Sequence, residues 1–229
     1  MALAAVAHAR HLIAAVAERL LVYVADPMCS WCYGFGPELA ALCEHYPDVP
    51  VHIVMGGLRA YNTKVMDRAM AQTLGHHWEE VQRKSGQPFT RTHLERDDFV
   101  YDTEPACRAV VTVRENNAAL ALPMLHAVQR AFYAQGLDVT RGEVLTDVYA
   151  NVCAAADDSE FDATAFFAAF ESDSVKATTR DDFVLAQEWG IRGFPTLLAV
   201  HGERPHLVAP GYMKASALIE RTREIFETA

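Results

Sequence analysis

The chain has 229 residues, of which 51% are hydrophobic and 22% are charged, and its formal net charge is −10. This length and apolar content suffice for a substantial core and exclude global disorder. The acidic balance disfavours nucleic acid and anionic membrane surfaces as partners, and no apolar run reaches the roughly 18 residues that a membrane-spanning helix needs.

The N-terminal segment, residues 1–19, is rich in alanine and is predicted to be an amphipathic helix or an extension. Charged residues and histidines interrupt it, so the continuous apolar region of a signal peptide does not form. It also runs directly into an apolar stretch at residues 20–25, which leaves no room for a cleavage site. We therefore expect a cytoplasmic protein, with an incorrectly assigned start codon as the alternative explanation of this segment.

A strand, a helix and a second strand are predicted next. Residues 20–25 form a continuous apolar run, which is typical of a strand buried on both faces. Helical spacing begins near Cys29, and a second apolar strand follows at residues 49–55. This order predicts a βαβ unit with two parallel strands.

Between residues 62 and 153 apolar residues recur at helical spacing without a convincing strand. Helices are predicted over residues 103–114, 118–134 and 140–152. The last of these opens with Thr140 and Glu143 in the spacing of a capping box. Four or five helices in succession indicate a helical insertion.

The α/β pattern returns in the C-terminal third of the chain. Helices are predicted over residues 161–170, 179–189 and 214–227, and strands over residues 196–200 and 206–209. The short polar, glycine-containing segment between the two strands predicts an antiparallel hairpin.

The motif Cys29-Ser30-Trp31-Cys32 carries the clearest chemistry in the chain. The first cysteine is expected at the N-terminus of a helix, where free N–H groups and the helix dipole stabilise a thiolate. We predict that Cys29 attacks a disulfide of a partner and that Cys32, one turn deeper, resolves the mixed disulfide. The alternative is half of a zinc site, but the sequence offers no second ligand pair, so no metal is predicted.

Phe194-Pro195 precedes the strand predicted at residue 196. Proline lacks an N–H donor, and cis peptide bonds are almost confined to X–Pro. A cis bond here would turn the Phe194 backbone outward, where it could pair with an extended substrate. An ordinary trans proline at the start of a strand is the alternative.

Several side chains near the motif have roles that the sequence leaves open. Trp31 is expected to be exposed, and it either offers a flat surface to apolar substrates or packs on a neighbouring loop. Asp26 either caps the following helix, which we favour, or accepts a proton near the cysteines. Cys43, Cys107 and Cys153 are predicted to be buried, inert cysteines.

Two segments and the helices between them resemble the DsbA family, in particular its FrnE-like branch. The segments are Asp26-Pro27-Met28-Cys29-Ser30-Trp31-Cys32 and Gly193-Phe194-Pro195-Thr196. The resemblance implies an α/β thioredoxin fold with an inserted all-helical domain. Residues 20–60 and 157–229 would form the thioredoxin-like domain, and residues 61–156 the helical insertion.

The resemblance also implies which residues form the site. Cys29 would be the reactive cysteine, Cys32 the resolving one, and Pro195 a cis-proline facing them. We further predict that Trp31, Phe194 and Pro195 contact the substrate, and that Asp26, Ser30 and Thr196 support the site. Many relatives carry a buried acid six residues before the reactive cysteine, where this chain has Tyr23. The proton acceptor for Cys32 is therefore left open between Asp26, water and none.

The function implied is that of a thiol–disulfide oxidoreductase or protein disulfide isomerase acting on protein or peptide disulfides. It needs no bound cofactor, and glutathione is a candidate redox partner. Reduction or isomerisation is favoured over net oxidation, because no export signal is predicted. Two alternatives remain. One is a glutathione-dependent transferase or isomerase of the kappa or chromene-carboxylate type, whose members generally lack the second cysteine. The other is a non-catalytic peptide-binding module.

Overall fold

The computed structural model describes residues 19–228, except residues 159 and 203. The predicted N-terminal helix or extension thus lies outside the described residues, apart from Arg19, which begins the first strand.

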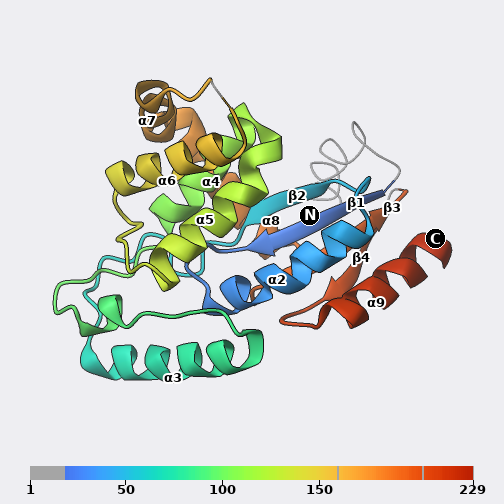
Figure 1. Ribbon diagram of the computed structural model, residues 1–229, viewed down its shortest axis with the longest axis horizontal. Coiled ribbons are helices and arrows are strands. Elements are labelled where there is room, and N and C mark those ends of the chain that lie inside the picture. Colours follow the sequence, from blue (N-terminus) through green and yellow to red (C-terminus); the bar gives the residue numbers. More distant parts are fainter. Residues whose placement is uncertain (1–18, 159, 203, 229) are drawn as a thin grey trace.

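Four strands of the described chain form one mixed sheet in the order β2-β1-β3-β4 (Figure 1). They are β1 (Arg19–Ala25), β2 (Val51–Met55), β3 (Thr196–His201) and β4 (Arg204–Ala209). Strand β1 is parallel to β2 and antiparallel to β3, and β3 is antiparallel to β4. The predicted βαβ unit and C-terminal hairpin are confirmed, although β4 begins two residues earlier than expected.

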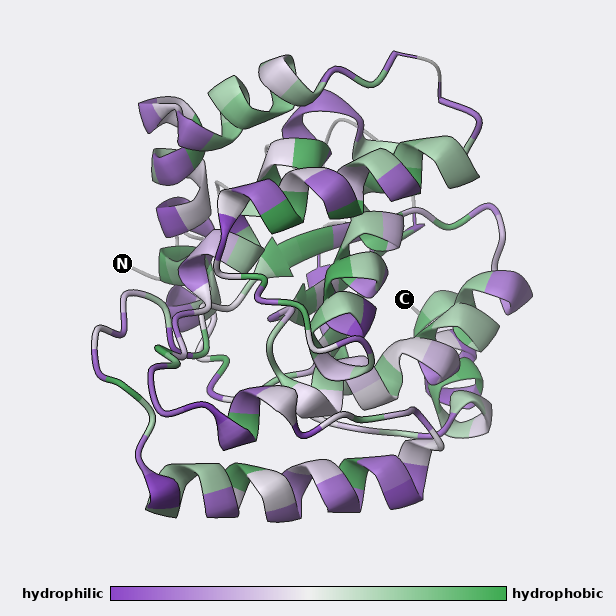
Figure 2. Ribbon diagram, turned by 60° about the vertical axis from the view of Figure 1, so that its left-hand side comes forward, coloured by the Kyte–Doolittle hydropathy of each residue, from purple (hydrophilic) through white to green (hydrophobic). Residues whose placement is uncertain are grey.

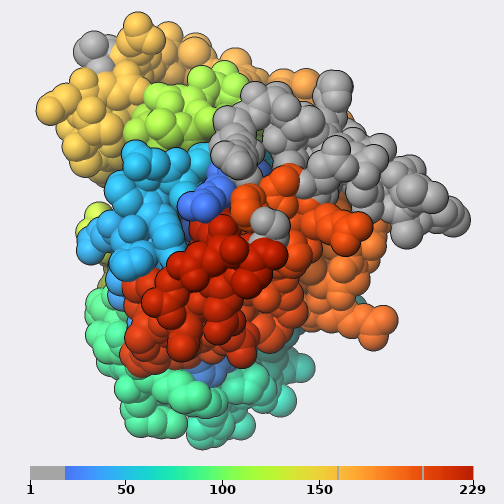
Figure 3. Space-filling model, turned by 90° about the vertical axis from the view of Figure 1, so that its right-hand side faces the viewer, coloured from blue at the N-terminus to red at the C-terminus, as the bar shows by residue number. Residues whose placement is uncertain are grey.

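Both faces of the sheet are covered, as the continuous apolar runs predict. Alternate residues of β1 point to opposite faces: Tyr23 joins the core under α2 (Ser30–His45) and α9 (Ala215–Thr228). Val22 instead joins a smaller cluster under α8 (Asp173–Glu188). Figure 3 shows α9, in red, on the surface beside the blue segment that ends α2, and the two helices are in contact.

The helices inserted between β2 and α8 lie in two places: the first packs against α2, and the other four gather beside the sheet (Figure 1). They are α3 (Arg68–Ser85), α4 (Glu104–Asn116), α5 (Ala121–Tyr133), α6 (Gly142–Ala155) and α7 (Ala163–Glu171), with 3₁₀ turns η1 (Thr92–Glu95) and η2 (Ala118–Leu120). The helices predicted at the positions of α4, α5 and α6 are confirmed. Helix α7 contacts both α4 and α6. The domain boundaries at residues 60 and 156 stay predictions.

Two sequence-based expectations about the helices are wrong in detail. Helix α6 begins at Gly142 without a side-chain cap, because the Thr140 hydroxyl donates to Asp138 Oδ1 at 2.6 Å instead of capping the helix. Helix α8 begins six residues before the expected position, because the Ser172 hydroxyl accepts a hydrogen bond from Val175 N and caps it there.

Helix α3 was not resolved as a separate element by the sequence pattern. Figure 2 shows it as a largely hydrophilic helix along one edge of the molecule. Of its 18 residues only Gly75, Trp78 and Val81 are buried. Most of its residues are polar, so its overall hydropathy is low and it stands out less than the more apolar helices around it.

Candidate active site

The two cysteines of the motif lie where the chain passes from β1 into α2. Cys29 is the N-cap residue of α2, and Cys32 lies in its first turn. Cys29 is 7% exposed and Cys32 is fully buried, and both thiols are free. Cys32 is thus the more shielded of the two residues, as predicted, although both are buried.

The surroundings of Cys32 favour the protonated form of its thiol. Burial raises the pKa of the Cys32 thiol well above its usual value, and the neighbouring Cys29 sulfur adds to the rise. The Tyr23 hydroxyl donates to the Cys32 main-chain oxygen at 3.5 Å. Burial raises the pKa of Tyr23 as well, so this phenol stays protonated and does not accept a proton from Cys32.

The loop before β3 faces the first cysteine. The Phe194–Pro195 peptide bond is cis, as the family resemblance implies. Cys29 Sγ donates to the Phe194 main-chain oxygen at 3.5 Å. The Phe194 ring lies against Gly56, where an added β-carbon would be only 2.1 Å from Phe194 Cζ. Thr196 begins β3 and is buried, with its hydroxyl donating to Gly193 O at 2.8 Å.

Asp26 does not cap α2, so the favoured interpretation is wrong. Its carboxylate is fully buried and accepts hydrogen bonds from Met28 N at 2.8 Å and from Leu58 N at 2.6 Å. The chain makes a turn before the helix begins, and its N-cap residue is Cys29, which forms no side-chain cap. The carboxylate therefore ties the turn before Cys29 to the loop after β2.

Asp26 belongs to a small polar group beneath the dithiol. Burial raises the pKa of its carboxyl, although hydrogen bonds led by that of Thr103 act in the opposite direction. Cys107 Sγ donates to Asp26 Oδ2 at 3.5 Å, and burial raises the pKa of this thiol too. The charge of Asp26 also raises the pKa of Cys32, so the carboxyl and the buried thiol interact electrostatically. Cys107 is buried as predicted, but its thiol also contacts Asp26, which the prediction of an inert cysteine did not include.

Trp31 is half-buried rather than exposed. Its ring centroid lies 5.7 Å from that of Tyr212, and Lys84 Nζ lies 5.5 Å above the ring. Of the two interpretations of Trp31, the packing contact is therefore present. Its contact with a substrate stays a prediction, as does the supporting role of Ser30, the first residue of α2.

Two tyrosines that the sequence did not single out hold the turn before Cys29. Tyr101 and Tyr133 both donate to the Met28 main-chain oxygen, Tyr133 at 2.6 Å. Tyr33, which follows Cys32, stacks on Tyr133 with ring centroids 5.1 Å apart. The sequence indicates only that buried tyrosine hydroxyls need partners; it does not identify these partners.

The described residues lack two features that belong to other classes of function. No three or more His, Cys, Asp or Glu side chains in this part of the chain are grouped to hold a metal ion. No helix in it is long and apolar enough to cross a membrane.

The family follows from a match that spans most of the chain. A family model described as a DSBA-like thioredoxin domain matches residues 20–214. The chain belongs to this DSBA-like family. The predicted fold, a thioredoxin fold with inserted helices, is thereby confirmed, whereas the FrnE-like branch stays a prediction. None of the curated protein sequences gives a match.

Solved structures of other DsbA-like proteins are similar over nearly their full length. A putative protein disulfide isomerase from Nitrosomonas europaea is 34% identical, with a TM-score of 0.82 over 92% of this chain and 98% of that chain. The cytosolic disulfide reductase DsbM from Pseudomonas aeruginosa is 27% identical, with a TM-score of 0.71 over 91% and 97%. A 2-hydroxychromene-2-carboxylate isomerase, 14% identical with a TM-score of 0.60 over 91% and 95%, shares the fold.

Proposed function

We propose that this DsbA-like protein catalyses thiol–disulfide exchange on protein or peptide disulfides, as a reductase or isomerase of the cytosol. The observation that carries the proposal is the asymmetry of the dithiol. The Cys29 sulfur lies at the N-terminus of α2, 3.5 Å from the Phe194 oxygen, while Cys32 is fully buried one turn further on. A partner disulfide therefore meets Cys29 first, beside the Phe194 backbone and the Trp31 ring.

The exchange proceeds in two displacements. The Cys29 thiolate attacks one sulfur of the substrate disulfide, so a Cys29–substrate bond forms, the substrate S–S bond breaks, and the leaving sulfur takes up a proton. Cys32 then loses its proton and attacks Cys29 Sγ, which releases the second substrate thiol. Two electrons pass from the dithiol to the substrate, and the chain is left with a Cys29–Cys32 disulfide.

The second displacement requires a proton acceptor, because burial raises the pKa of Cys32. Asp26 is the acceptor we propose. Its raised pKa suits a group that takes up a proton and releases it again. Tyr23, at the position where many relatives carry an acid, stays protonated and does not serve.

Glutathione is proposed as the reductant that closes the cycle. Two glutathione molecules would reduce the Cys29–Cys32 disulfide and leave as glutathione disulfide. Support comes from similarity to DsbM, a cytosolic disulfide reductase whose structure with GSH is 28% identical to this chain. A glutathione pool keeps the dithiol reduced only if the reduction potential of the Cys29–Cys32 pair lies above about −250 mV. Equilibration with glutathione buffers measures that potential and decides between net reduction and net oxidation.

Insulin reduction tests the proposal directly. Cys29→Ser should abolish the activity, and Cys32→Ser should accumulate a mixed disulfide with the substrate that mass spectrometry detects. Cys43→Ser is the matched control, because Cys43 lies on the same helix, is half-buried and is remote from the motif in sequence. Insulin reduction that persists in Cys29→Ser would refute the exchange mechanism.

The same variants separate the two other functions. Glutathione conjugation that survives in Cys32→Ser would favour the alternative of a glutathione-dependent transferase or isomerase. Peptide binding that is unchanged in Cys29→Ala, in a protein that reduces no disulfide, would favour a binding module.

A further inference from the structure

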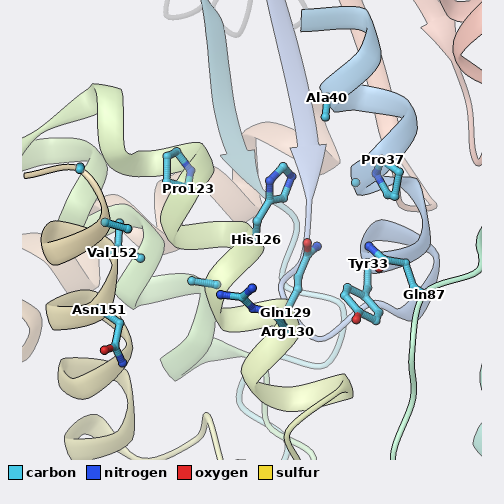
Figure 4. Close-up of a pocket in the computed structure, with 14 residues that line it drawn as sticks. Tyr33, Pro37, Ala40, Gln87, Pro123, His126, Gln129, Arg130, Asn151 and Val152 are labelled. Carbon is cyan, nitrogen blue, oxygen red and sulfur yellow. The ribbon is translucent and has the colours of Figure 1, made fainter. Parts of the chain in front are cut away.

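A cavity of about 590 Å³ opens between α2, α5 and α6 (Figure 4). Neither cysteine of the motif lines it, and neither does Phe194. Its volume lies within the range of small-molecule sites in proteins. The cavity is therefore a second candidate site, separate from the sulfur of Cys29.

The lining combines apolar walls with nitrogen donors. The walls include Pro37, Pro123 and Val152. The chain contains 30 Asp and Glu residues, yet none of them lines the cavity. The lining instead carries the exposed side chain of Arg130, which follows Gln129 on α5 (Figure 4). In so acidic a protein, such a lining favours an anionic ligand.

Two buried nitrogen atoms of the lining are without partners. Gln129 is 1% exposed, and its Nε2 finds no hydrogen-bond partner among the described residues. The same holds for His126 Nε2. Figure 4 shows the Gln129 amide directed into the space between His126 and Tyr33. A buried donor without a partner destabilises the fold unless a ligand or water satisfies it.

Of the two unpartnered atoms, His126 Nε2 lies beside Gly36, as does the amide nitrogen of Gln87. A β-carbon added to Gly36 would lie 3.7 Å from His126 Nε2 and 4.0 Å from Gln87 Nε2. Burial lowers the pKa of His126 to about 4, so its ring is neutral at pH 7. The formal charge offered to a ligand is then that of Arg130.

We propose that this cavity binds a small organic carboxylate with an apolar body. The carboxylate accepts hydrogen bonds from Arg130 and from the Gln129 amide, and the apolar body contacts the proline and valine walls. Glycine at position 36 keeps the space above His126 open. This site does not depend on the dithiol, so its test is independent of the proposed exchange activity.

Calorimetric titration of the full chain tests the ligand class. Octanoate is the probe, 1-octanol is the control without a charge, and acetate is the control without an apolar body. Octanoate should bind at one saturable site, and each control at least about tenfold more weakly. No saturable octanoate binding up to about 10 mM, or equal affinity for 1-octanol, would overturn the proposal.

Variants test the residues. Arg130→Gln should weaken octanoate binding about tenfold or more while leaving insulin reduction unchanged. Arg83→Gln, on the exposed side of α3, is the matched control and should bind octanoate like the wild type. Equal octanoate affinities in these two variants would overturn the assignment.

Gln129→Leu distinguishes a ligand-binding residue from a structural one. Leucine keeps the volume and removes the unpartnered donor, so the ligand-free variant should melt about 2–4 °C higher than the wild type. Its octanoate affinity should fall about tenfold or more. Unchanged octanoate affinity in Gln129→Leu would refute the role of the amide, whatever happens to the melting temperature.

Discussion

Replacing Gly56 by alanine should displace the ring of Phe194. The backbone of Gly56 is not left-handed, so alanine is tolerated by the main chain and the effect is steric. The added β-carbon would lie 2.1 Å from Phe194 Cζ and 2.3 Å from Cε1. Carbon atoms in contact are about 3.5–4.0 Å apart, so the ring must move by about 1.5 Å or leave its place. Overpacking of this kind costs about 1–3 kcal/mol.

The displacement should also lower activity. The Phe194 oxygen contacts Cys29 Sγ, and ring and carbonyl belong to the same residue. We expect Gly56→Ala to reduce insulin at least about tenfold more slowly than the wild type, and to unfold at a lower urea concentration. Gly211→Ala is the control, because a β-carbon built at Gly211 meets nothing within 4 Å.

A second substitution tests the steric reason. In Gly56→Ala combined with Phe194→Leu, the shorter side chain relieves the collision. The double variant should therefore be more stable than the sum of the two single effects predicts. Additive single effects, or a Gly56→Ala protein with unchanged activity and stability, would refute the reasoning.

Two further predictions concern buried polar groups. Tyr101→Phe and Tyr133→Phe each remove one of two hydroxyls that donate to the same main-chain oxygen, so each should cost about 0.5–1.5 kcal/mol in urea unfolding. The double variant leaves that oxygen without either donor and should cost about 1 kcal/mol more than the sum, whereas simple additivity would contradict a shared acceptor. Burial, aided by Arg114, lowers the pKa of His52 to about 4 from an ordinary 6.5. Because the unfolded chain takes up this proton first, the stability that neutral His52 provides is complete above about pH 6.5 and is lost as the pH falls to about 4. At about 1.4 kcal/mol per pH unit, the wild type should lose about 3 kcal/mol more free energy of unfolding than His52→Gln over this pH range. Free energies of unfolding that vary in parallel with pH in the two proteins would refute this prediction.

Much of the fold follows from local patterns in the sequence. Strand β1 follows from a continuous apolar run, β2 from a mostly apolar one, and the hairpin of β3 and β4 has a polar turn between its strands. The dithiol and its position at the start of α2 are likewise visible, because each depends on neighbouring residues, whereas the placement of Phe194-Pro195 opposite the dithiol was implied by the family resemblance. Helix α3 was not predicted as a separate element, since its low overall hydropathy hides it among polar segments.

The sequence by itself determined the α/β pattern with inserted helices, the pair of cysteines and their relative depth, because periodicity and helix-end position act over a few residues, and the thioredoxin fold was implied by the family resemblance. Only the tertiary structure decided what Asp26 does, since its partners at Leu58 and Cys107 come from distant segments. The same is true of Tyr101 and Tyr133 at the turn before Cys29, and of the cavity lined by helices far apart in the chain. Burial and hydrogen bonding at such places depend on which segments meet, and that is a property of the packed chain rather than of any short stretch of it.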